Sequence, residues 1–104
     1  MATHIFDIDG TLVDYHTSEW LKGAKETIIK LANANHDIIL ITMRGIQDEG
    51  TIWSIENTQK TILKDLDDHN IKYRILFGVQ SPRTLHDDSP AFVDQRYTNQ
   101  PYFT

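Results

Sequence analysis

The chain has 104 residues, a formal net charge of -5 and no cysteine. This length allows one domain, and the lack of cysteine excludes disulfides, zinc–thiolate sites and thiol catalysis. The acidic balance argues against a broad nucleic-acid-binding face, because such a face requires a basic patch.

Strands and helices are expected to alternate along the first half of the chain. The apolar run at residues 4–8 predicts a buried strand that leads into a turn at Asp9-Gly10. From Ser18 onward, apolar residues recur at helical spacing, which predicts a helix that ends near residues 33–35. The uninterrupted apolar run at 38–42 is typical of a central parallel strand covered on both faces.

The second half of the chain continues this alternation. A second amphipathic helix is expected at residues 51–69 and a third strand at 73–77. Residues 91–93 are expected to form a last short strand, whereas no position is predicted for the polar and aromatic tail at 95–104. This order is the signature of an α/β fold with a doubly wound parallel sheet, so we expect a single three-layer domain over residues 1–104.

Chemically active side chains lie where the predicted strands end. Asp7 and Asp9 close the first strand, Thr42 ends the second, and Asp87-Asp88 follow the third. In a parallel sheet with right-handed crossovers, the carboxyl ends of the strands share one edge, and ligands bind along it. The sequence therefore predicts that these distant segments converge on one pocket.

The segment Asp7-Ile8-Asp9-Gly10-Thr11 places two carboxylates close together. Alternation along a strand puts Asp7 and Asp9 on the same side, and Gly10 lets the backbone turn sharply beside a ligand. Two carboxylates at this spacing repel when both are ionised, so one is expected to bind a cation or to hold a proton. The expected roles are Asp7 as ionised nucleophile and metal ligand, and Asp9 as proton carrier.

Residues 5–12 resemble the first motif of the haloacid dehalogenase (HAD) superfamily of phosphohydrolases. Residues 39–44 resemble its second motif, an apolar strand that ends in serine or threonine. The resemblance extends to about Val93 and implies a HAD-like Rossmannoid domain without a cap. It also implies that Asp7 forms an aspartyl-phosphate, while Asp9 protonates the leaving group and then activates water.

The resemblance further implies a phosphate cradle and a magnesium site. Thr42 and Met43 would hold a phosphoryl oxygen through the threonine hydroxyl and nearby backbone amides. Asp87 and Asp88 match the acidic fourth motif best and would bind Mg²⁺ together with Asp7 and Asp9. The sequence Phe92-Val93-Asp94 offers a rival register, in which Asp94 is the acidic ligand.

One departure from the family pattern concerns the lysine of the third motif. Some small relatives carry it just after the third strand, where this chain has Val79-Gln80. Arg83 is the favoured substitute for phosphate binding, and Lys60 or Lys64 could also reach in from the second helix. Arginine suits phosphate recognition but is not interchangeable with lysine.

These features predict a cytoplasmic, Mg²⁺-dependent phosphatase that hydrolyses phosphate monoesters and does not enter the membrane. Its expected partner is a small phosphorylated molecule such as a phosphosugar or a nucleotide, although a phosphorylated nucleic-acid end would also fit an open site. Because no insertion is large enough for a cap, a second copy of the chain is expected to cover the site.

Two alternatives remain open from the sequence. A catalytically silent HAD-like binding module would explain the missing lysine. A receiver-like signalling domain also uses a carboxylate cluster and Mg²⁺, but its phosphorylated aspartate ends the third strand. Residues 75–78 contain no aspartate, which argues against the receiver.

Overall fold

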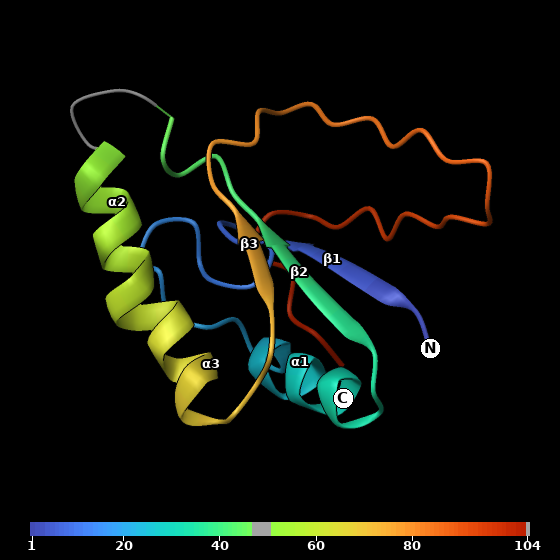
Figure 1. Cartoon of the computed structure of the whole chain (residues 1–104). Coiled ribbons are helices and arrows are strands. Elements are labelled where there is room, and N and C mark those ends of the chain that lie inside the picture. Colours follow the sequence, from blue (N-terminus) through green and yellow to red (C-terminus); the bar gives the residue numbers. More distant parts are fainter. Residues whose placement is uncertain (47–50, 104) are drawn as a thin grey trace.

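The computed structural model describes residues 1–46 and 51–103 (Figure 1). The predicted alternation of strands and helices is confirmed in this part of the chain, and the fold is α/β. No helix in the described ranges is long and apolar enough to span a membrane. In chain order the elements are β1 (Thr3–Asp7), α1 (Ala24–Asn33), β2 (Asp37–Ile41), α2 (Thr51–Thr58), η1 (Gln59–Leu63), α3 (Lys64–Asp68) and β3 (Arg74–Leu76).

The three strands form a parallel sheet in the order β1-β2-β3, so β2 occupies the central position that its apolar sequence predicts. Asp7 pairs with Ile41, and Ile41 pairs with Leu76. The carboxyl ends of all three strands are therefore level with one another. This register places the residues that follow each strand along a single edge of the sheet.

One face of the sheet carries the core. Ile38 and Leu40 of β2 are buried there, and Phe6 and Ile75 pack against the same cluster. On the opposite face, Ile5 is 51% exposed and Leu76 is 57% exposed. Because successive strands step in one direction, right-handed crossovers place both helical connections on the same face.

The helical segment after β2 runs without interruption from α2 through η1 to α3, close to the predicted helix at 51–69. The five residues of η1 have π-helical geometry. Asp65 on α3 accepts hydrogen bonds from Trp20 Nε1 (2.8 Å) and Lys25 Nζ (3.1 Å). These bonds tie the far end of the segment to the stretch around the start of α1.

The prediction of a last strand at 91–93 is wrong. Residues 80–95 form an exposed, extended segment without helix or strand, and Phe92 is 91% exposed (Figure 1, orange to red). The apolar side chains of 91–93 find no partner surface, so their β-propensity is not realised. Residues 96–103 then return to the domain, where the Tyr102 N–H donates to the Lys22 carbonyl (2.8 Å).

Candidate active site

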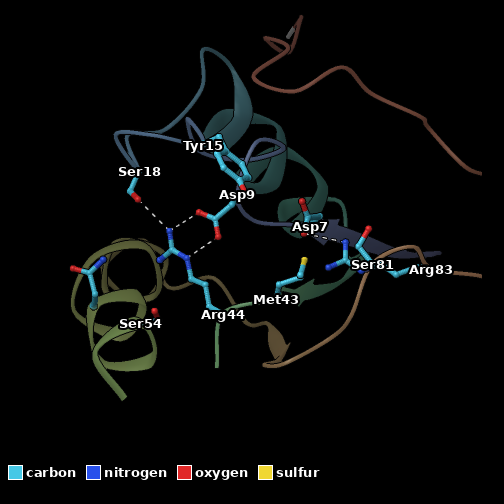
Figure 2. A pocket seen from close by; sticks show the side chains of 10 residues that line it. Asp7, Asp9, Tyr15, Ser18, Met43, Arg44, Ser54, Ser81 and Arg83 are labelled. Carbon is cyan, nitrogen blue, oxygen red and sulfur yellow. Dashed lines mark hydrogen bonds and ion pairs between the residues drawn. The ribbon is translucent and has the colours of Figure 1, made fainter. Parts of the chain in front are cut away.

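A pocket of about 600 Å³ lies at the carboxyl edge of the sheet (Figure 2). It gathers residues from the end of β1 and the turn after it, the loop after β2, helix α2 and the segment that follows β3. The predicted site residues Asp7, Asp9, Met43 and Arg83 all line it. The remaining lining residues are Tyr15, Ser18, Arg44, Ser54, Asn57 and Ser81.

A tight turn after β1 presents the two aspartates to this pocket. The Ile8 carbonyl accepts N–H bonds from Thr11 (3.2 Å), Leu12 (2.9 Å) and Val13 (3.2 Å). The apolar side chains of residues 8, 12 and 13 are fully buried and anchor the turn in the core. Gly10 has φ +81°, a left-handed conformation that glycine adopts without the steric cost of a Cβ. The aspartates on either side of Ile8 are thereby left at the surface of the pocket.

Asp7 is held by two neighbouring groups. Its Oδ2 accepts a hydrogen bond from the Thr11 hydroxyl (3.1 Å). Its Oδ1 accepts a charge-assisted bond from Arg83 Nη1 (3.0 Å), although the two residues are 76 positions apart. Arg83 is itself steadied by the carbonyls of Val79 (3.1 Å) and Gln80 (3.2 Å). A fixed positive charge therefore faces the carboxylate of Asp7.

Asp9 is paired with Arg44, a residue that the sequence analysis did not single out. Arg44 Nε donates to Asp9 Oδ2 (2.8 Å) and Nη2 donates to Asp9 Oδ1 (2.6 Å), which is a bidentate pair. Arg44 Nη2 also donates to Ser18 Oγ (3.1 Å), and Nη1 donates to Thr58 Oγ1 (2.7 Å). The guanidinium thus joins the β1 turn to helix α2, and Figure 2 shows its contacts with Asp9 and Ser18.

Thr42, the predicted phosphate-binding residue, is fully buried immediately after β2 and does not line the pocket. Its hydroxyl accepts a hydrogen bond from the Arg44 backbone N–H (3.0 Å), and its carbonyl accepts one from the Val79 N–H (2.8 Å). Met43, the next residue, lines the pocket and is partly exposed. Thr42 therefore holds the loop that carries Met43 and Arg44.

The structure does not bring Asp87 and Asp88 to the pocket. Both are exposed on the extended segment, and Asp87 Oδ1 accepts the Ser89 N–H (2.9 Å) in a local turn. Within residues 1–46 and 51–103, no group of three or more histidine, aspartate or glutamate side chains could hold a metal ion.

Asp94 pairs with Arg96 (3.0 Å) beside Tyr102. Burial raises the pKa of Tyr102 above its usual value, Arg96 offsets part of this shift, and the charges of Asp94 and Asp7 add to it. Asp94, the acidic residue of the rival register, is exposed and, like Asp87 and Asp88, is absent from the pocket lining.

The two lysines considered as substitutes for the family lysine do not line the pocket. Lys60 is exposed on η1. Lys64 pairs with Asp68 one helical turn away (2.7 Å), and this partner raises the pKa of the lysine. Arg83 and Arg44 are the cations in the pocket lining.

The sequence model of the haloacid dehalogenase-like hydrolases matches residues 4–63, more than half of the chain. The matched range contains Asp7, Asp9, Thr42 and Arg44. The chain belongs to the haloacid dehalogenase-like hydrolases. No curated protein and no solved structure matches it significantly.

Membership of the HAD-like family accounts for the first half of the pocket. Within the matched range, Asp7 ends β1, Asp9 follows in the turn, and Thr42 follows β2. Arg83 and the acidic residues of the extended segment lie outside the matched range. Their assignment depends on the geometry alone, and that geometry favours Arg83 as a pocket residue.

Proposed function

We propose that this HAD-like hydrolase is a phosphatase that cleaves phosphate monoesters, with Asp7 as the nucleophile. The observation that carries the proposal is that Asp7 and Asp9 line one pocket and that each is faced by an arginine. A pocket that combines a carboxylate nucleophile, a second carboxylate and positive charge has the groups that phosphoryl transfer requires.

In the proposed reaction, a carboxylate oxygen of Asp7 attacks phosphorus and the bond to the leaving-group oxygen breaks. Asp9 gives its proton to that oxygen, and an aspartyl-phosphate remains. Asp9 then takes a proton from water, whose oxygen attacks phosphorus, so that inorganic phosphate leaves and Asp7 is restored. Arg83 would offset the charge on the phosphoryl oxygens.

The Arg44–Asp9 pair sets a condition on this reaction. Both oxygens of Asp9 accept N–H bonds from Arg44, so neither is free on the guanidinium side. When Asp9 carries a proton, one of these bonds has to open or the proton has to occupy the outer lone pair. Arg44 is therefore proposed to orient Asp9 toward the leaving group.

We propose Mg²⁺ as the cofactor, as is usual in this family. Asp7 and Asp9 offer the oxygen donors that Mg²⁺ prefers, but the described residues bring no third acid beside them. The acidic residues expected to complete the site do not lie there in this structure, since Asp87, Asp88 and Asp94 are exposed and none of them lines the pocket. When bound, the ion would neutralise charge on the phosphoryl group and orient it.

The proposed substrate is a small phosphorylated molecule such as a phosphosugar or a nucleotide, and a phosphorylated polymer end would also fit. The exposure of Tyr15 and Met43 at the pocket supports an open, capless site. A second copy of the chain is proposed to cover this opening. Sedimentation that finds a fully active monomer would exclude that arrangement.

The deciding experiment is a phosphatase screen with Mg²⁺ that compares the native protein with Asp7→Asn. We expect the substitution to lower kcat about a thousandfold or more, because the amide is a poor nucleophile. Asp37→Asn is the matched control, since Asp37 is exposed at the opposite end of β2. Equal turnover by the native and Asp7→Asn proteins would refute the nucleophile assignment.

A binding module without turnover is the second candidate. The ion pairs that occupy both aspartates favour it, because they leave neither carboxylate free. Phosphate binding without turnover by the native protein would support this module instead of the phosphatase.

A further inference from the structure

The C-terminal segment 96–103 packs against the same turn that carries the aspartates. Arg96 lies over the ring of Tyr102, with the guanidinium carbon 3.7 Å from the ring centroid. The Arg96 guanidinium also donates to the Pro101 carbonyl (2.8 Å), which closes the segment into a compact loop. Tyr102 packs against the core cluster. The segment is therefore a folded part of the domain.

Asn99 connects this segment to the pocket through two hydrogen bonds. Its backbone N–H donates to the Gly10 carbonyl (2.8 Å), directly after Asp9. Its side-chain Oδ1 accepts the Tyr15 N–H (2.8 Å), and Tyr15 lines the pocket. One residue thus holds both the aspartate turn and a pocket wall across a separation of 84 positions.

The backbone at Asn99 is suited to this double contact. Asn99 has φ +64°, a left-handed conformation that asparagine tolerates better than most residues. The turn around it is closed by the Gln100 N–H, which donates to the Tyr97 carbonyl (3.1 Å), and by Gln100 Oε1, which accepts the Tyr97 N–H (2.9 Å). The side chain of Asn99 is thereby presented to Tyr15.

The two glycines that face the segment make its close approach feasible. A Cβ on Gly10 would lie 3.2 Å from the Thr98 methyl group and 3.5 Å from the Tyr15 ring. A Cβ on Gly23 would fall on the backbone carbonyl of Tyr102. The turn, the Tyr15 ring and the C-terminal segment are consequently packed together around Gly10.

We propose that Asn99 is a positioning residue for the pocket, which fixes the Tyr15 wall and the turn that carries Asp9. The inference rests on the proposed function for its kinetic consequence. The contact between Asn99 and Tyr15 holds the side of the pocket away from Arg83. Its loss should weaken substrate binding more than it slows the chemical step.

The test uses Asn99→Gly, which keeps the left-handed backbone and the N–H but removes the acceptor of the Tyr15 N–H. We expect the KM for p-nitrophenyl phosphate to rise about three- to tenfold, as the loss of one hydrogen bond implies, with kcat changed less than about twofold. Asn99→Asp retains an acceptor and should keep a KM near the native value.

Asn70→Gly is the matched control. Asn70 also has a left-handed backbone (φ +59°), but it follows α3 at the amino-terminal end of the strands. It should leave KM unchanged. Amide hydrogen exchange at Tyr15 supplies a readout independent of activity, and Asn99→Gly should accelerate it.

Three results would overturn the inference: an equal rise in KM with Asn70→Gly, no recovery with Asn99→Asp, or an unchanged KM despite faster exchange at Tyr15. If the native protein turns over no phosphate ester, the proposed function fails. The affinity for inorganic phosphate, measured by calorimetry, then decides this inference separately. Weaker binding in Asn99→Gly but not in Asn70→Gly supports it, and equal binding refutes it.

Discussion

The Arg44–Asp9 pair allows a quantitative prediction for Arg44→Met. The substitution removes the bidentate pair with Asp9 and the hydrogen bonds to Ser18 and Thr58. The Arg44 side chain is only 11% exposed, so its polar partners are left in a partly dry environment. Methionine preserves most of the apolar stem, and the loss should therefore come from the polar contacts.

The size of the loss follows from the exposure of each partner. Breaking a buried ion pair costs about 3–5 kcal/mol, because the remaining charge has no compensation. Asp9 is 27% exposed and can recruit water, so we expect about 2–3 kcal/mol. For a domain of this size, that corresponds to a melting temperature roughly 10–20 °C lower. Arg44→Lys should recover only part of the loss, since lysine lacks the planar fork.

Urea denaturation, followed by circular dichroism, measures the free energy of unfolding. Arg83→Met is the control, because Arg83 is more exposed and makes one bond to Asp7; its cost should be below about 1 kcal/mol. A double-mutant cycle between Asp9→Asn and Arg44→Met isolates the pair. Equal losses for the two arginine variants, or a coupling below about 0.5 kcal/mol, would refute the reasoning.

Two further predictions concern stability. Gly23→Ala should destabilise the fold by at least about 1 kcal/mol more than Gly78→Ala. Both glycines have positive φ, but only a Cβ at position 23 meets the Tyr102 backbone. Equal urea midpoints for the two variants would contradict this prediction. Burial and a hydrogen bond to Asp67 raise the pKa of Tyr73 to about 12. The stability that this shift contributes is complete below pH about 10 and is lost as the pH rises through about 12. An ultraviolet titration should show a late tyrosinate step that Tyr73→Phe removes, and ionisation of Tyr73 near its usual pKa would contradict the prediction.

The strands and the long helical segment could be predicted because their signals are local. An apolar run or a helical periodicity indicates a strand or a helix from a short stretch of sequence, without information from the rest of the chain. Parallel strands bring their carboxyl ends to one edge, which predicts that Asp7, Asp9, Thr42 and Asp87-Asp88 converge there. Asp7 and Asp9 line the pocket, whereas Thr42 and the Asp87-Asp88 pair are absent from its lining. These features need only short segments and a topological rule.

The start of α1 shows where local signals mislead. Helical spacing begins at Ser18, but the helix begins at Ala24. Asp14 accepts N–H bonds from His16 (2.8 Å) and Thr17 (3.0 Å), which lower its pKa, and Ser18 adopts φ +61°. This side-chain turn competes with helix formation and delays it by more than one turn.

The partners of Arg44 and Asn99 could not be read from the sequence. Arg44 is joined to Asp9 across 35 positions, and its role depends on the relative placement of the β1 turn and α2. Asn99 contacts backbone atoms of Gly10 and Tyr15, which any sequence provides. An interaction with a backbone group leaves no complementary residue type to detect. Gly10, where the C-terminal segment approaches the turn most closely, is the one residue whose type reflects this contact.

The extended segment 80–95 separates two well-anchored stretches of chain, β3 on one side and residues 96–103 on the other. A protease that cleaves within this exposed segment would leave the smaller fragment held by noncovalent contacts alone, among them its hydrogen bonds to Gly10, Tyr15 and Lys22 and the packing of Tyr102 against the core. Reassociation would then become bimolecular and dilution-sensitive, because the covalent tether no longer keeps the local concentration high. On dilution of the cleaved protein, the C-terminal peptide would dissociate and its hydrogen bonds to the aspartate turn would be lost. Adding the peptide back would restore them.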